Sequence, residues 1–152
     1  MLPFQGTWVF MSALALNYPR KPSELADDLE SFHHVLCWMG IRYHKHNLTG
    51  NLPELEPLIR TYYEAYRHGA DGSFYGSTAK YDAMVEGRVP IRLDPETCAN
   101  LRNLLQKLVG LCSIHYAAVD KSALIPFGKP MLKKSGPTTK GTDEEANRRP
   151  SR

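Results

Sequence analysis

The chain has 152 residues, of which 42% are apolar, and its formal net charge is +3. This length fits one globular domain and leaves no room for a second full one. Seven of the nineteen Lys and Arg residues, but only three of the sixteen Asp and Glu residues, lie from position 126 onward. The body before that point is therefore near neutral and gives no reason to expect a nucleic-acid partner.

Three cysteines, Cys37, Cys98 and Cys112, lie far apart in apolar stretches. Their number is odd and they form no CxxC pair, so neither a disulfide framework nor a thiolate metal site is expected. Free buried thiols are typical of a reducing compartment. The N-terminus lacks the charged region of a signal peptide, and no stretch reaches the roughly 18–20 apolar residues of a membrane span. These features predict an intracellular protein, cytoplasmic or nuclear, without a membrane partner.

The first strongly periodic segment is DDLESFHHVLCWMG, residues 27–40. It predicts a helix with Asp27 as N-cap, Glu30 completing a capping box and Gly40 at the end. Apolar residues recur along it at helical spacing, namely Leu29, Phe32, Val35, Leu36, Trp38 and Met39. They cover more than half of the helix circumference, which predicts burial from several sides.

Two further helices are expected after a polar loop. Residues 54–68 carry an amphipathic pattern that Gly69 ends, with three tyrosines expected to pack inward: Tyr62, Tyr63 and Tyr66. The next turn-rich stretch is followed by Ser77, which can cap a short helix ended by Gly87.

The clearest helix signal is Asp94-Pro95, an N-cap followed by proline at the first helical position. The apolar pattern then continues to about Ala118. No convincing strand pair is visible, so the body, residues 1–125, is predicted to be all-α. Residues 126–152 are rich in Pro, Gly, Ser, Thr and charge, which predicts a disordered basic tail. Its short basic pairs resemble nuclear import signals but are common in solvated tails.

The titratable pairs offer weak candidate chemistry. His33-His34 and the pair His44 and His46 carry good metal ligands, but neither pair has a third ligand at the usual spacing. The simpler interpretation is that His33 is packed or hydrogen-bonded and that the loop pair, His44 and His46, is solvated. Asp27 and Asp28 could form an acid-base pair, yet adjacent helical side chains diverge and capping explains one of them. No phosphate-binding glycine loop or nucleophile motif is present. The motifs alone therefore predict neither a catalytic residue nor a metal site.

Two segments, GTWVFMS at residues 6–12 and DDLESFHHVLCW at residues 27–38, together resemble the fungal-type protein kinase family. The first resembles the end of a kinase activation segment and the second the central helix of the C-terminal lobe. The order of the later helices agrees with that lobe, so the resemblance covers about Gly6 to Val119. It implies a partial kinase-like C-terminal lobe.

The resemblance also implies roles for individual residues. Thr7, after Gly6, matches the threonine that helps to orient the catalytic aspartate, and Asp28 matches the aspartate that receives backbone amides from the catalytic loop. The substrate-facing ledge then comprises Trp8, Phe10, Met11 and Ser12. Ser12-Ala13-Leu14 stands where kinases place Ala-Pro-Glu, so the usual glutamate of that motif is missing.

A kinase also needs a glycine-rich loop, a lysine, a catalytic-loop aspartate and a metal-binding Asp-Phe-Gly. All of these precede the activation-segment end, and five residues before Gly6 cannot contain them. We therefore expect no ATP or magnesium site and no catalysis in this chain alone, although a complete family member uses both to phosphorylate protein Ser/Thr. The alternatives are a non-catalytic helical module that binds a protein partner and a pseudokinase remnant.

A final expectation concerns the central helix, which upstream elements cover in a complete lobe. Without them, Leu29, Phe32, Leu36 or Met39 is expected to be uncovered. Each such side chain left in water forfeits about 1.5–3 kcal/mol, whereas a small domain has only about 5–15 kcal/mol of stability. Marginal stability or self-association through this helix is the expected result.

Overall fold

The computed structural model describes residues 8–70 and 72–127. This part is mostly helical, as predicted, with six α-helices, one two-stranded sheet and three short irregular helices. In chain order the elements are η1 (Trp8–Phe10), α1 (Ala13–Asn17), α2 (Leu25–Tyr43), α3 (Leu52–Ile59), the π-helical turn η2 (Arg60–Glu64), β1 (Tyr66–His68), β2 (Phe74–Gly76), α4 (Thr78–Glu86), α5 (Ala99–Ala118), α6 (Lys121–Leu124) and η3 (Ile125–Phe127).

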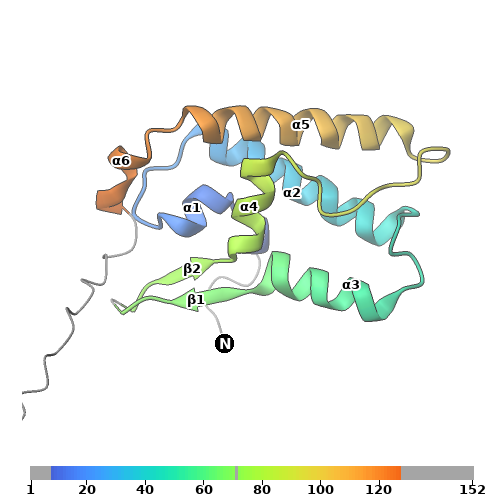
Figure 1. Cartoon of the computed structure of the whole chain (residues 1–152), viewed down its shortest axis with the longest axis horizontal. Helices are drawn as coiled ribbons and strands as arrows, with labels where there is room; N and C mark the ends of the chain where they lie inside the picture. The colour runs from blue at the N-terminus through green and yellow to red at the C-terminus, as the bar shows by residue number, and fades with distance from the viewer. Residues whose placement is uncertain (1–7, 71, 128–152) are drawn as a thin grey trace, which may run out of the picture.

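The two long helices, α2 and α5, pack along each other, and α4 packs against α5 from the same side of the molecule as α1. Figure 1 shows α5 along one edge of the molecule, with α3 and the hairpin β1–β2 along the opposite edge and α4 between them. No single described helix is long and apolar enough to span a membrane. Within the described residues, the helical segments Ala99–Ala118 and Lys121–Phe127 reach the length and apolar composition of a span only when taken together, and the chain bends by 84° between them.

The hairpin corrects the all-α prediction. Strands β1 and β2 are antiparallel, and Arg67 pairs with Tyr75 at the centre. The helix predicted over residues 54–68 instead stops being α-helical at Ile59, passes through the π-helical turn and becomes extended from Ala65. The apolar pattern at its end fits a short strand as well as a helix, and a strand partner nearby decides between them.

Helix α2 begins earlier and ends later than predicted. Glu24 is the N-cap, and its reciprocal capping-box partner is Asp27, so the box lies three residues before the predicted one. Gly40 does not stop the helix, because it serves close packing: a Cβ there would lie 3.2 Å from the side chain of Leu93. The helix continues to Tyr43.

The two later helices agree with the sequence in different degrees. The Ser77 hydroxyl caps α4, and Gly87, at a φ of 66°, ends it as predicted. Helix α5 ends at Ala118 as predicted but begins only at Ala99. Asp94 caps a separate turn, in which its carboxylate accepts the Glu96 amide at 2.8 Å.

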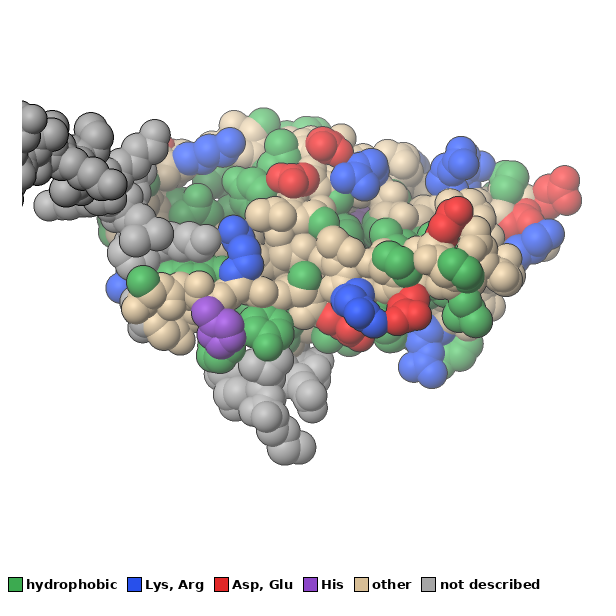
Figure 2. Space-filling model, turned by 60° about the horizontal axis from the view of Figure 1, so that its bottom comes forward, with side chains coloured by type: hydrophobic (Ala, Val, Ile, Leu, Met, Phe, Trp, Pro, Cys, Tyr) green, Lys and Arg blue, Asp and Glu red, His purple; other side chains and the backbone are tan. Residues whose placement is uncertain are grey.

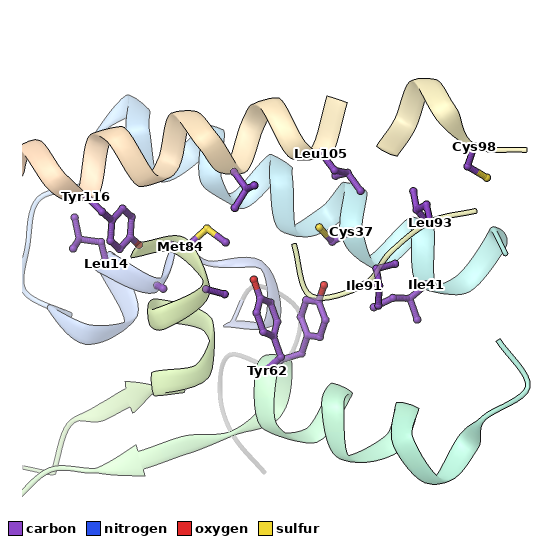
Figure 3. Packing of buried hydrophobic residues seen from close by; sticks show 14 of the residues in the cluster. Leu14, Cys37, Ile41, Tyr62, Met84, Ile91, Leu93, Cys98, Leu105 and Tyr116 are labelled. Atoms are coloured by element: carbon purple, nitrogen blue, oxygen red, sulfur yellow. The ribbon is translucent and has the colours of Figure 1, made fainter. Parts of the chain in front are cut away.

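The core lies between α2, α4 and α5. Figure 3 shows its side chains converging from these helices and from the tyrosines below them. Among the buried hydrophobic residues are Leu14, Cys37, Ile41, Tyr62, Tyr63, Met84, Ile91, Leu93, Leu105, Val109 and Tyr116. Tyr62 and Tyr63 are buried as predicted, whereas Tyr66 is 42% exposed on the hairpin.

Helix α2 is oriented against the usual pattern. Its buried residues include Asp27, Glu30, His33 and His34, while Leu29, Phe32 and Met39 are 55%, 55% and 45% exposed. The prediction that this helix is buried from several sides is therefore wrong, and the expectation of an uncovered apolar stripe is confirmed.

Candidate functional site

The predicted ledge lies beside the N-terminal half of α2. Trp8 and Phe10 belong to η1, and the ring of Phe10 meets the edge of Trp38 on α2 at 6.2 Å between centroids. Met11 follows, and Ser12 caps α1. Gly6 and Thr7, the remaining residues predicted for this segment, lie outside the described residues. The structure thus brings the two segments of the resemblance, residues 8–12 and α2, into contact.

Ser12 is the first polar link between the ledge and α2. Its hydroxyl donates to the Asp27 carboxylate at 2.7 Å and also accepts the Ala15 amide at 3.0 Å. The other oxygen of Asp27 accepts from Lys21 Nζ at 2.8 Å and from the Glu24 amide at 2.9 Å. Burial opposes ionisation of Asp27, but these donors outweigh it and lower the pKa of the carboxyl below its usual 3.8.

Glu30 forms the second link. One carboxylate oxygen accepts the Ala13 amide at 2.7 Å, and the other accepts the Tyr116 hydroxyl of α5 at 2.8 Å. His34 Nε2 lies 3.1 Å from the same oxygen as Ala13. Burial raises the pKa of Glu30 above its usual 4.5, although the hydrogen bonds and the charge of Lys80 oppose the rise. Glu30 therefore joins α1, α2 and α5 at one buried point.

Lys80 of α4 holds the ledge from the other side. Its Nζ donates to the carbonyl oxygens of Val9 at 2.7 Å and Met11 at 3.4 Å. The ammonium also lies 6.0 and 5.6 Å from the ring centroids of Tyr62 and Tyr63, within the range of cation–π attraction. Burial lowers the pKa of Lys80 to about 8. The backbone of residues 8–11 is thus fixed by a buried cation.

The histidines are structural in this arrangement. His33 and His34 are fully buried, and burial lowers the pKa of His33 to about 4 and that of His34 well below 6.5. A neutral His34 protonated on Nε2 donates to Glu30, so this contact is a hydrogen bond and not an ion pair. In the loop pair, His44 is exposed but His46 is buried against the Ile41 carbonyl at 3.2 Å, which corrects the expectation that both are solvated.

Asp28 and Cys37 form no reactive arrangement with the described residues, whereas Cys98 Sγ lies 3.2 Å from His44 Nδ1. Asp28 is exposed, and its side chain forms no hydrogen bond or ion pair with the described residues, whereas its backbone amide donates to the Glu24 carbonyl at 3.4 Å. Cys37 is buried, and burial raises the pKa of its thiol to about 12, so it is not a nucleophile. No group of three or more His, Cys, Asp or Glu side chains within the described ranges could hold a metal ion.

A separate surface hollow of about 480 Å³ lies between the loop after α4 and helix α5. Three arginines line it, Arg88, Arg92 and Arg102, and Arg88 is paired with Glu86 at 2.8 Å. Over the face shown in Figure 2, acidic and basic side chains are interspersed among apolar ones, and no large patch of one sign stands out. The hollow does not adjoin the ledge.

The buried network formed by Ser12, Asp27, Glu30, Lys80 and Tyr116 contains residues that the sequence did not single out. The sequence indicates Glu30 only as a capping residue and Asp27 as a capping residue or half of an acid-base pair, and it gives no sign of Lys80 or Tyr116. Lys80 is 71 residues from Val9, and Tyr116 is 86 residues from Glu30. A local pattern carries no sign of such distant partners.

The hydrogen bonds of this network fix main-chain atoms in place. The side chains of Asp27, Glu30 and Lys80 are buried, and each is hydrogen-bonded to at least one main-chain atom. What the arrangement can do is hold the backbone of residues 8–13 rigidly against α2, α4 and α5. No family model, no curated protein and no solved structure matches the chain.

Proposed function

We propose that this chain is the C-terminal part of a fungal-type protein kinase domain, which in complete form transfers phosphate from ATP to protein Ser/Thr. One observation supports the proposal most strongly. The segment that resembles an activation-segment end, residues 8–12, is held directly on the helix that resembles the central helix, through Ser12 and Asp27. In the resembled family these two segments must meet for the ledge to present a protein substrate.

The buried links supply what the missing glutamate does elsewhere. In kinases the Ala-Pro-Glu glutamate fastens this segment to a distant arginine, and here Leu14 takes its position. The hydrogen bonds from Ala13 to Glu30 and from Lys80 to Val9 provide an alternative fastening. Charge-assisted hydrogen bonds of this kind are stronger than neutral ones, so the ledge is held despite the altered motif.

The exposed position of Asp28 agrees with this proposal. An aspartate that receives backbone amides from a catalytic loop must be free to accept them, and Asp28 is exposed at the start of α2. No catalytic, ATP-binding or magnesium-binding role is assigned to a residue of this chain. We therefore expect the chain alone to be inactive, and its complete product to need upstream catalytic elements.

A second candidate function is a helical module that binds another protein without catalysis. The exposed apolar stripe of α2 favours it, because a solvated protein seldom leaves such a row of leucine and aromatic side chains uncovered.

Expression of the complete reading frame tests the first function. The complete product is expected to transfer labelled phosphate from ATP to a Ser/Thr substrate, and the Asp28→Asn variant to lose most of this activity while it remains folded. The chain of 152 residues, assayed in parallel, is expected to give no transfer. Activity of the complete product that survives both Asp28→Asn and Thr7→Ala would show that the assigned roles are wrong.

A further inference from the structure

The apolar stripe on the outer side of α2 runs along the whole helix. Its members are Leu25, Leu29, Phe32, Leu36, Met39 and Tyr43. Leu25 is 74% exposed and Tyr43 is 65% exposed, so the stripe is open at both ends, and only Leu36 is half-buried. From Leu25 to Tyr43 it is about 27 Å long.

The spacing of the stripe is that of a coiled-coil seam. Its residues follow one another at intervals of four, three, four, three and four. This repeat of 3.5 residues keeps a stripe facing a second helix and places each side chain in a hole of that helix. An ordinary core-facing stripe has a broader pattern. The core-facing side of α2 is polar over its N-terminal half and buries Cys37, Gly40 and Ile41 over its C-terminal half.

The charges beside the stripe indicate which helix fits. Asp28 flanks its N-terminal end, and Arg42 flanks its C-terminal end, 14 residues or two heptads later and therefore on the same side. Both side chains are exposed. Arg42 lies over the ring of Tyr43 at 5.7 Å. Neither Asp28 nor Arg42 forms an ion pair within the described ranges.

We propose that the stripe is the interface of a homodimer, in which α2 of a second copy packs antiparallel along α2. The dyad then lies beside residue 34, so that Leu25 meets Tyr43, Leu29 meets Met39 and Phe32 meets Leu36 of the other copy. In an antiparallel coil, the flanking positions on one side of the stripe face the same set of positions on the other copy. Asp28 of each copy therefore lies opposite Arg42 of the other, which gives two such pairs by symmetry. Antiparallel packing also sets the helix dipoles in opposition.

A parallel pair lacks this complementarity. It would place Asp28 at the same level as Asp28 of the second copy and opposite position 33, which is buried in its own chain. The antiparallel register is therefore the one that satisfies the exposed charges. It also uses one surface patch on both copies, as a two-fold interface requires.

The size of the surface is typical of a weak, reversible interface. Six half-exposed side chains from each copy bury in total about 1,000–1,200 Å², which is near the lower limit for a specific interface. The dissociation constant is therefore expected on the order of 1–100 µM, so that the dimer dissociates on dilution.

Sedimentation of the full chain over a concentration series tests the proposal. The wild-type chain is expected to be a dimer at high concentration. Phe32→Glu places a charge beside the dyad and is expected to weaken dimerisation by at least about tenfold. Leu52→Glu, on α3, replaces a side chain that is 71% exposed, and it is expected to leave the dimer unchanged. Far-UV circular dichroism checks that each variant is folded.

Charge exchange tests the register. Asp28→Arg and Arg42→Asp are each expected to weaken the dimer several-fold, and the double variant to restore it. Failure of the double variant to recover would overturn the antiparallel register. A wild-type chain that stays monomeric at about 200 µM, well above the expected constant, would overturn the dimer and leave the stripe to a different occupant, such as a segment preceding this one. None of these results depends on kinase activity, so the dimer and the proposed function fail separately.

Discussion

The buried network depends most on Glu30, because its carboxylate accepts hydrogen bonds from α1, from α5 and from a histidine of its own helix. Tyr116→Phe removes one of these donors and leaves the ring in place. Since the buried acceptor loses a hydrogen-bond donor, we expect the free energy of unfolding to fall by about 1–3 kcal/mol. Chemical denaturation measures it.

Tyr81→Phe is the matched control for this change. The Tyr81 ring packs against Tyr116 at 5.3 Å between centroids, but its hydroxyl forms no hydrogen bond to Glu30. Its loss is expected to change stability by less than about 0.5 kcal/mol. Equal effects of the two variants would mean that the Glu30 contact contributes nothing specific.

His33 makes the stability of the fold depend on pH. Its pKa is about 4 in the folded chain and 6.5 as the ordinary value, so between these values the unfolded chain holds a proton that the folded chain lacks. The contribution of this residue is therefore lost as the pH falls from 6.5 toward 4. His34 acts in the same direction, and Glu30, whose pKa is raised, acts against both.

The comparison of wild type with His33→Gln isolates this residue. Between pH 7 and pH 5 the wild-type chain is expected to lose about 2 kcal/mol more of its free energy of unfolding than the variant. Denaturation curves at the two pH values provide the numbers. If the two chains lose the same amount, His33 is not held neutral in the fold.

At this scale the sequence predicted part of the site. The sequence predicted that an aspartate takes part in the capping box of α2 and that His33 is packed, because capping and helical periodicity are local signals. Asp27 was predicted as the N-cap, but Glu24 holds that position, and Asp27 accepts from Ser12 while Asp28 is exposed. That difference depends on where the helix begins, which shifts by a few residues without a clear sign in the sequence.

Among the elements, the loop of residues 8–12 is held by α4 through one side chain. Lys80→Met keeps the length of the side chain and removes the ammonium that binds the Val9 and Met11 carbonyls. The two carbonyls then lose this buried donor, which costs about 1–3 kcal/mol. We therefore expect amide hydrogen exchange in residues 9–12 to accelerate by at least about tenfold, with a lower melting temperature.

Lys107→Met supplies the control for the exchange experiment. Lys107 is exposed on α5, so its replacement is expected to leave exchange in residues 9–12 unchanged. Unaltered exchange in the Lys80 variant itself would show that the lysine does not fasten the loop.

The contact between β2 and α1 has no room for one more carbon atom. A Cβ on Gly76 would lie 2.6 Å from Leu16 Cβ and 2.8 Å from Leu16 Cδ1. Gly76→Ala is therefore expected to destabilise the chain by about 1–3 kcal/mol. In Gly110→Ala, where a Cβ meets nothing within 4 Å, the helix α5 is expected to gain about 0.5–1 kcal/mol. Thermal unfolding of the two variants should shift in opposite directions, and a shift in the same direction would contradict the close approach.

Elements with strong local signals were predicted well. Helix α4 has a serine cap and a glycine end, and both act as expected. The hairpin was missed because three-residue strands carry no periodic pattern, and their pairing across residues 66–76 is a tertiary event. The start of α5 was misplaced because Asp94-Pro95 is an equally good start for a single turn.

For the whole molecule, the orientation of α2 is the feature that sequence patterning gave wrongly. Hydrophobic periodicity places the apolar side inward, yet α2 turns its aspartate, glutamate and histidines inward and leaves its leucines outside. On the polar side, Glu30 accepts hydrogen bonds from α1 and α5, while Nδ1 of His33 and Nδ1 of His34 are buried without a hydrogen-bond partner; a single-helix pattern does not reveal these contacts. In the proposed complete kinase domain upstream elements would cover the outward stripe and Asp28, whereas in the proposed dimer of this chain a second copy covers them, so the two arrangements exclude each other.

The most direct test of the kinase proposal is to read the native transcript upstream of the codon for Met1. We predict an open reading frame that continues upstream and encodes a glycine-rich loop, a lysine, a catalytic-loop aspartate and Asp-Phe-Gly. Residues 8–12 would then complete an activation segment, and Asp28 would receive the catalytic loop. An in-frame stop codon shortly before Met1, with translation starting there, would contradict the proposal that this chain is part of a kinase domain.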